Sequence, residues 1–174
     1  MNKVGGRAAG IDPVFSSISV DHSQSVTVKW LEAMHSSAFL PPETQSHAFN
    51  RTLLLRHLTV DHVEPGLVIS TLKVKPSIAN VYDTLHGGAV AMIASIMGLA
   101  AVKTVAGDKE FVQTEINISC LSAARIGVEL EVEAKVLKLG KSIATTSIDI
   151  RNKDSKQVTF QCRCTFYSMP TSCI

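Results

Sequence analysis

The chain has 174 residues, 45% hydrophobic and 18% charged, and its 17 Lys and Arg against 15 Asp and Glu give a formal net charge of +2. This length fits one domain that can bury a core without disulfide support. The composition excludes an intrinsically disordered chain. The near-neutral charge gives no reason to expect nucleic acid or an anionic membrane surface as a partner.

Residues 1–45 are expected to form a flexible extension with one short helix that ends at Pro41-Pro42. That helix is indicated by apolar residues at roughly helical spacing: Trp30, Leu31, Met34 and Phe39. We expect the folded domain over residues 46–168 and a tail over 169–174. No apolar run of signal-peptide length stands near the N-terminus, so the cytoplasm is the expected compartment, and organelle targeting stays open.

From about Leu54 the apolar residues recur with period two, which is typical of strands with one buried face. One strand begins with Leu54, Leu58 and Val60, and a second follows the turn at residues 64–66. Four later runs alternate in the same way, over residues 112–120, 128–136, 143–151 and 158–166, with hairpin turns at 139–142 and 152–155. In the first of these runs, Val112, Thr114 and Ile116 are expected on one face, and Gln113 and Glu115 on the other.

One segment breaks this rhythm. From Gly87 to Val102 no residue is charged, and Ser95 has the single polar side chain. The run is shorter than the about 20 residues of a membrane span, so we predict a buried helix and no membrane span. Two strands, a buried helix and four strands predict an α+β fold with an antiparallel sheet enclosing a helix. The hot-dog fold has this order, and so do other α+β arrangements.

The four cysteines lack the spacing of a metal site or a Cys-x-x-Cys motif. Cys162 and Cys164 lie two apart in an alternating run, so both point to one face of a strand. We interpret all four, including Cys120 and Cys173, as small apolar core residues in a reducing compartment. No metal and no cofactor is expected.

The most informative stretch is Asn80 to Gly88, which leads into the predicted helix. Gly87 and Gly88 at its first turn would let a ligand approach backbone N–H groups that have no intrahelical partner. The helix dipole would stabilise an oxyanion or a polarised carbonyl there. His86 could orient a water molecule, or it could simply cap the helix.

The residues Thr84-Leu85-His86-Gly87-Gly88, with Asn80 before them, resemble the active-site signature of the hot-dog acyl-CoA thioesterase family, and the similarity extends over roughly residues 50–168. The resemblance implies a hot-dog fold and hydrolysis of acyl-CoA to a free acid and coenzyme A. It implies that the Gly87 N–H holds the thioester carbonyl while Asn80 and His86 shape the loop, next to Gly88.

The resemblance also implies a homo-oligomer, a dimer or a dimer of dimers, with each site at a subunit interface. Coenzyme A would lie across the subunit surface, where cations meet its phosphates. The residues expected there are Glu115, Arg125, Lys138, Gly140, Lys141 and Ser142. An ordinary charged hairpin at 138–142 is the alternative.

The sequence departs from the family where water is activated. The resemblance implies that a carboxylate on the helix of the neighbouring subunit activates water, and its position here is Ser95. The position of a serine or threonine that helps to place the water is Gln113. A hydroxyl is a poor general base near neutral pH, and a general base typically contributes about 10²–10⁴-fold.

Three explanations remain open. Asp83 or Glu115 could replace the carboxylate, Ser95 and Gln113 could position water in a slow enzyme, or the protein could bind acyl-CoA without turnover. A Ser95 nucleophile is disfavoured because no triad accompanies it, and dehydration of hydroxyacyl thioesters is weaker because it also needs a carboxylate. Met92, Ile93, Ile96 and Met97 fit an acyl site and a core equally well.

Overall fold

The computed structural model describes residues 27–30 and 57–169. Residues 27–30 are helical. The remaining elements are β1 (Leu58–Glu64), β2 (Leu67–Lys73), the 3-10 turn η4 (Pro76–Ile78), α3 (Gly87–Ala106), β3 (Phe111–Cys120), β4 (Glu129–Leu139), β5 (Ile143–Asn152) and β6 (Val158–Ser168). This order confirms the predicted succession of two strands, a helix and four strands.

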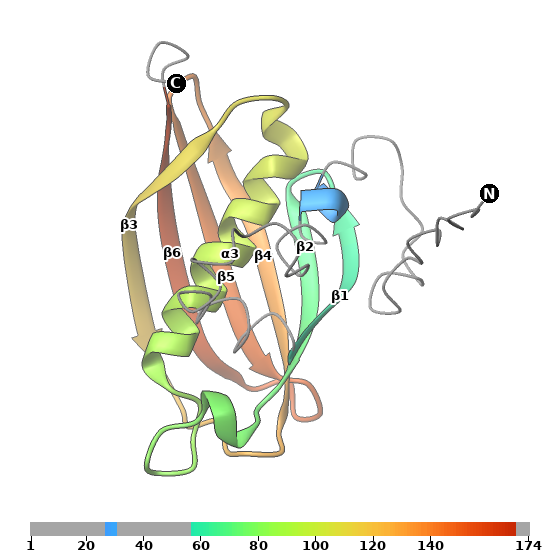
Figure 1. Cartoon of the computed structure of the whole chain (residues 1–174), viewed down its shortest axis with the longest axis vertical. Coiled ribbons are helices and arrows are strands. Elements are labelled where there is room, and N and C mark those ends of the chain that lie inside the picture. Colours follow the sequence, from blue (N-terminus) through green and yellow to red (C-terminus); the bar gives the residue numbers. More distant parts are fainter. Residues whose placement is uncertain (1–26, 31–56, 170–174) are drawn as a thin grey trace, which may run out of the picture.

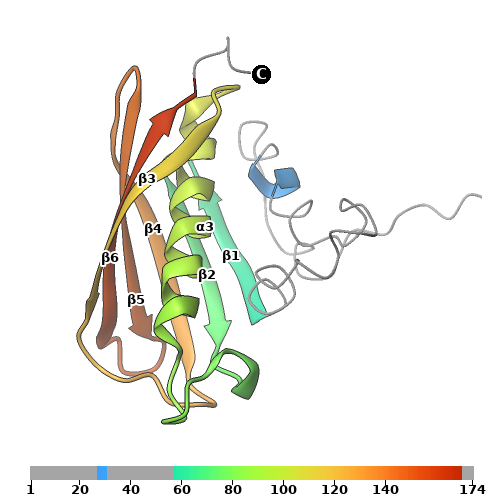
Figure 2. The same ribbon diagram turned by 60° about the vertical axis from the view of Figure 1, so that its left-hand side comes forward.

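The six strands form one antiparallel sheet in the order β1-β2-β4-β5-β6-β3, so β1 and β3 are its edges. The chain leaves β2 near one edge and returns in β3 at the other, and α3 makes the crossing. Figures 1 and 2 show the helix lying along one face of the curved sheet, whose outer face is turned away from it. The expected α+β architecture, a sheet wrapped around one long helix, is confirmed.

One side of α3 packs on the sheet, and this burial explains why the sequence of the helix is apolar. Its length and composition would suffice to cross a membrane, yet most of the helix is buried inside the domain, as expected for a core helix. Ile93 and Met97 are fully buried, whereas Met92 and Ile96 lie half-buried. The four residues that fitted both a core and an acyl site are therefore divided between two sides of the helix.

The helix α3 lies close against the sheet at Gly98. A Cβ at this position would lie 2.8 Å from Thr146 Oγ1 and 3.1 Å from Phe166 Cζ. The helix can sit this close only because the residue has no side chain. These contacts also show that Thr146 on β5 and Phe166 on β6 face the helix.

The predicted faces of β3 are wrong at its start. A β-bulge lies between Gln113 and Glu115, where no residue of β6 stands opposite Thr114 in the strand register. As a result Phe111 is buried and Val112 is 43% exposed, although Val112 was expected to share the apolar face of Ile116. An extra residue in one strand reverses the alternation beyond it, and simple period-two counting cannot detect this.

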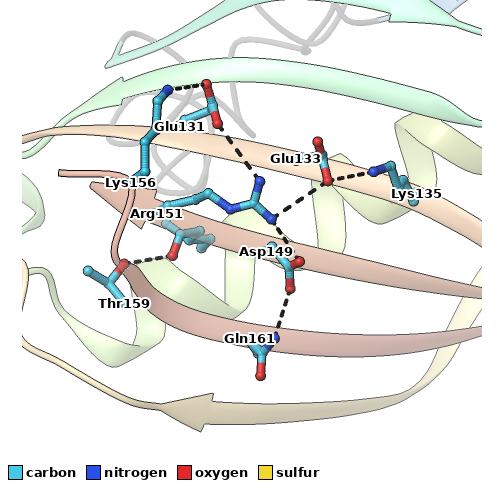
Figure 3. Close-up of polar contacts among 9 residues, drawn as sticks. Glu131, Glu133, Lys135, Asp149, Arg151, Lys156, Thr159 and Gln161 are labelled. Carbon is cyan, nitrogen blue, oxygen red and sulfur yellow. Dashed lines mark hydrogen bonds and ion pairs between the residues drawn. The ribbon is translucent and has the colours of Figure 1, made fainter. Parts of the chain in front are cut away.

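The outer face of the sheet carries a network of charges, drawn in Figure 3. Glu133 on β4 stands directly opposite Asp149 on β5, a pairing of like charges. The guanidinium of Arg151 lies 3.0 Å from Asp149, 3.8 Å from Glu133 and 3.9 Å from Glu131. Arg151 bridges the three carboxylates, while Lys135 pairs with Glu133 (2.8 Å) and Lys156 with Glu131 (3.2 Å).

The short helix at 27–30 touches the core beside the C-terminal part of α3. Thr27 and Val28 are buried, and the Trp30 ring lies 5.6 Å from the Lys103 ammonium. The other residues expected in this helix (Leu31, Met34 and Phe39), together with Leu54 and Cys173, lie outside the described residues, as do the predicted domain boundary at residue 46 and most of the tail.

Candidate active site

The N-terminus of α3 is capped by His86. Its Nδ1 accepts a hydrogen bond from the Gly88 N–H (2.9 Å), and its carbonyl accepts the first intrahelical bond, from Val90. A Cβ at Gly88 would lie 3.1 Å from that Nδ1, so the glycine leaves room for the capping ring. The Gly88 N–H is thus already occupied.

Gly87 is the first residue of α3, and its N–H has no acceptor within the helix. The residue is exposed, and a Cβ built on it would meet nothing within 4 Å. Of the two glycines predicted at the site, Gly87 is the one whose N–H is open to a ligand, at the positive end of a 20-residue helix.

Asn80 folds the loop that delivers the chain to this helix. Its Oδ1 accepts hydrogen bonds from the Tyr82 N–H (2.9 Å), the Thr84 N–H (3.2 Å) and the Thr84 hydroxyl (3.1 Å). Asp83 adopts a positive φ of 58° inside this turn, a conformation that aspartate tolerates better than most residues. The shaping role expected for Asn80 matches these contacts, and Asp83 is a turn residue.

A second loop, after β3, holds the first one in place. The Leu85 N–H donates to the Ala124 carbonyl (2.8 Å), and the Ile126 N–H donates to the Asp83 carbonyl (3.0 Å). Arg125 forms an isolated bridge with Thr84. These bonds fix the two loops against each other beside Gly87.

The two loops line an open cavity of about 340 Å³. Its lining combines apolar residues with a few polar ones, which is the usual character of a small-molecule site. The lining residues are Asn80, Thr84, Leu85, Gly87, Cys120, Leu121, Ser122, Ala123, Ala124 and Phe160. Asn80 and Gly87 are the two predicted site residues that the cavity brings together.

Cys120 was missed by the sequence reasoning. It was interpreted as a core residue, but it is exposed at the end of β3 and lines this cavity. The core interpretation is correct for Cys162 and Cys164, where burial raises the pKa of the thiols to about 12 and about 11. The missing signal was position, because Cys120 ends its strand whereas the other two lie within β6.

Ser95 does not line the cavity. It lies about 12 Å along the axis from Gly87 at about 1.5 Å per residue, and its hydroxyl donates to the Ala91 carbonyl (2.8 Å). A serine hydroxyl that donates to its own helix is a poor general base for water. It is half-buried, on the same side of α3 as Met92 and Ile96.

The bulge in β3 separates the other two residues considered for water activation. Gln113 pairs with Phe166 and therefore faces the helix, while Glu115 pairs with Thr165 on the outer face and accepts from its hydroxyl (3.4 Å). Along β3, Gln113 lies about 23 Å from Cys120 at about 3.3 Å per residue. Neither residue can reach the cavity of its own chain.

The turn predicted to meet coenzyme A lies at the opposite end of the sheet. The Ser142 carbonyl accepts from the Ser168 N–H (2.8 Å), and β6 from Phe160 to Ser168 spans about 26 Å. Lys138, Gly140 and Lys141 belong to this far end, whereas Arg125 stands beside the cavity. Within the described part of the chain, no ion pair is formed by Lys138, Lys141 or Arg125.

Comparison with known proteins places this site in a family. Residues 82–159 match the family model described as Thioesterase superfamily. Acyl-coenzyme A thioesterase 13 of Homo sapiens is 33% identical over 120 residues, covering 69% of this chain and 84% of that protein.

Solved structures give the same result. Thioesterase superfamily member 2 of zebrafish superposes with a TM-score of 0.70 at 26% identity, covering 83% of this chain and 96% of that one. The PaaI protein of E. coli shares the fold, with a TM-score of 0.67 at 17% identity over 86% of this chain and 95% of that one. The chain therefore belongs to the thioesterase superfamily, as a relative of acyl-coenzyme A thioesterase 13.

Proposed function

We propose that this protein hydrolyses the thioester bond of an acyl-CoA to a free acid and coenzyme A. The observation that carries the proposal is the free N–H of Gly87, which opens from the start of a long helix into a cavity rimmed by Asn80. Membership of the thioesterase superfamily supports the same reaction.

In this reaction water adds to the thioester carbonyl carbon, and the carbonyl oxygen becomes an oxyanion. The Gly87 N–H and the helix dipole stabilise that charge where it develops. The carbon–sulfur bond then breaks, coenzyme A leaves as the thiolate, and the proton released by the water neutralises it. Asn80 contributes by holding the loop geometry, since its amide oxygen is fully used within the turn.

General-base assistance is the weak part of this site. Ser95 is bonded to Ala91, Asp83 is exposed in a turn, and Glu115 faces away from the helix. We therefore expect turnover about 10²–10⁴-fold slower than with a carboxylate at position 95. Because Ser95 does not line the cavity of its own chain, we expect position 95 to act at the site of the partner subunit, where Ser95→Asp should raise the rate.

We further propose that the working unit is a homodimer joined along β3, an edge strand whose Ile116 and Ile118 are half-buried. Antiparallel pairing about a twofold axis at Asn117 would bring Gln113 of the partner subunit opposite Cys120, because the bulge skips Thr114. It would also carry the partner's 138–142 turn toward the cavity, so that its lysines meet the phosphates of coenzyme A. A dimer of dimers is compatible with this pairing.

Replacing Gly87 tests the hydrolysis. Proline removes the N–H and suits the first residue of a helix, and His86 already has the extended conformation (φ −67°, ψ 132°) that precedes proline. Alanine is the matched control, because it keeps the N–H and its methyl has open space. With short, long and aromatic acyl-CoAs, we expect Gly87→Pro to lower kcat by about 10²–10³ and Gly87→Ala to stay near wild type.

Two results would contradict this proposal, the first for the role of Gly87 and the second for hydrolysis itself. Equal activity of the two variants would remove Gly87 from the mechanism. Binding of acyl-CoA by a wild type that hydrolyses none of the panel would identify a binding protein instead.

The dimer has its own test. Asn117→Cys, close to the proposed axis, should form a disulfide-linked dimer on mild oxidation, in a background without Cys120 and Cys173. Ser119→Cys, farther from the axis on the same strand, should not. A monomer at assay concentrations that still hydrolyses acyl-CoA would overturn the pairing.

A further inference from the structure

The side of α3 that faces away from the sheet carries an apolar stripe. Met92, Ile96 and Leu99 follow one another at helical spacing, and all three are half-buried. The hydroxyl of Ser95 in the same stripe is turned back onto the Ala91 carbonyl. The stripe begins beside Gly87 and meets its first charged residue at Lys103.

The length of this stripe fits one fatty acyl chain. From Gly87 to Lys103 the helix advances about 24 Å at about 1.5 Å per residue. With carbon–carbon bonds of about 1.5 Å in a zigzag, an alkyl chain advances about 1.3 Å per carbon, so about 18 carbons would fit between the two residues.

Trp30 lies at Lys103, beyond the far end of the stripe. Its ring lies 5.6 Å from the Lys103 ammonium, which also pairs with Glu110 (3.4 Å). The short helix that carries the indole is anchored, because Thr27 and Val28 beside it are buried. Figure 2 shows this helix near the C-terminal part of α3, at the end away from Gly87.

We propose that Trp30 is the specificity-determining residue that limits acyl chain length, by blocking the end of an acyl path along the outward side of α3. This inference rests on the proposed function, since it takes Gly87 as the point where the thioester is held. Each methylene that finds apolar contact adds about fourfold in affinity (~0.8 kcal/mol). Carbons that extend past Leu99 and reach Lys103 would meet the indole and a charged ammonium, and that gain would stop.

Binding gives a direct test, because Trp30 is the single tryptophan of the chain. Its fluorescence can be followed with non-hydrolysable thioether analogues of octanoyl-, palmitoyl- and arachidoyl-CoA. The octanoyl analogue should bind without changing the emission, whereas the palmitoyl analogue should shift or quench it. Binding of all three with unchanged emission would overturn the proposal, as would the same emission change with all three.

Hydrolysis gives the second test, with the same chain lengths as thioesters. In the wild type kcat/KM should rise with chain length up to palmitoyl and then fall at arachidoyl. Trp30→Ala should raise kcat/KM for arachidoyl-CoA about tenfold or more, as extra methylenes find contact, and leave octanoyl-CoA unchanged. Tyr167→Ala, which removes an exposed aromatic ring from β6, is the matched control and should leave the profile unchanged.

The two levels of the proposal fail differently. Loss of hydrolysis with every substrate, despite a fluorescence response to the long chain, would refute the proposed reaction and keep the acyl path. Normal hydrolysis with a chain-length profile that Trp30→Ala does not move would refute the end-stop alone.

Discussion

The two ends of the sheet differ in what they contribute. At one end, two loops bonded to each other line the cavity beside Gly87, where the Asn80 amide oxygen and the Gly88 N–H already have hydrogen-bond partners. At the other, Lys138 and Lys141 have no acidic partner within the described residues, and several apolar side chains are exposed: Val112, Leu137, Ile143 and Tyr167. The two ends lie about 26 Å apart, and in the proposed dimer the lysines of one chain would serve the cavity of its partner.

The largest expected effect is at the cavity end. Alkylation of Cys120 with a bulky maleimide should lower kcat/KM about 10²-fold or more, because displacing the substrate by as little as about 1 Å can cost that much. Burial raises the pKa of Cys162 and Cys164 to about 12 and about 11, so these two thiols stay protonated and unreactive near pH 8.

The matched control is the same labelling of Cys120→Ser, in a background that also lacks Cys173. Mass spectrometry should locate the adduct on Cys120 in the parent and find none in the control. Full activity of the labelled parent would show that the cavity is not the site of hydrolysis.

The next effect concerns the helix that joins the two ends. Alanine at an open helix position stabilises by about 1 kcal/mol relative to glycine, but at Gly98 the methyl would press on Thr146 and Phe166. We expect Gly98→Ala to lower the free energy of unfolding in urea by about 1–3 kcal/mol, while Gly87→Ala costs nothing.

The contact with Thr146 can be separated from the rest by a double-mutant cycle. In a Thr146→Ala background the cost of Gly98→Ala should shrink, because the nearest clashing atom is gone. Strictly additive effects would mean that Thr146 is not what keeps this position a glycine.

A smaller effect is expected at the far end. Replacing Lys138 and Lys141 together by serine should raise KM for acyl-CoA about tenfold with kcat unchanged, because charge-assisted bonds to phosphate would be lost while the reacting centre is untouched. The increase should diminish at high salt. Lys73→Ser, at the opposite end of the sheet and 54% exposed, is the control for an exposed lysine elsewhere, and an equal effect there would leave the turn with no special role.

Much of this fold could be predicted because its signals are repetitive. The alternation along β4 and β5 and the uncharged run after Gly87 each repeat over many residues, and one misread position does not change the result. The bulge at Thr114 could not be predicted, because a single unpaired residue leaves no periodic trace. It nevertheless decides that Gln113 and Glu115 point to opposite faces.

Part of the site was predictable because a short local motif contains it. His86, Gly87 and Asn80 stand close together in the sequence, so a local motif finds them. Cys120 reaches the cavity through the return of β3 beside β6, and Trp30 reaches Lys103 through tertiary packing. Neither contact follows from spacing in the sequence.

The smallest effect expected lies between the two ends, on the outer face of the sheet. Arg151→Met keeps the apolar stem and removes the charge that bridges Glu131, Glu133 and Asp149. With the Arg151 side chain only 23% exposed, we expect a loss of about 1 kcal/mol in the free energy of unfolding, more than for a typical surface pair. The loss should diminish with added salt, since it is repulsion among the remaining carboxylates.

Lys156→Met is the control for that change, because Lys156 is 60% exposed and pairs with Glu131 alone. It should cost less than about 0.5 kcal/mol. Equal losses in the two variants would show that the opposed Glu133 and Asp149 do not need Arg151. Neither variant should alter kcat/KM if the outer face only holds the cavity end and the lysine end at a fixed separation. A change in KM with unchanged stability would instead place this face within reach of the bound coenzyme A.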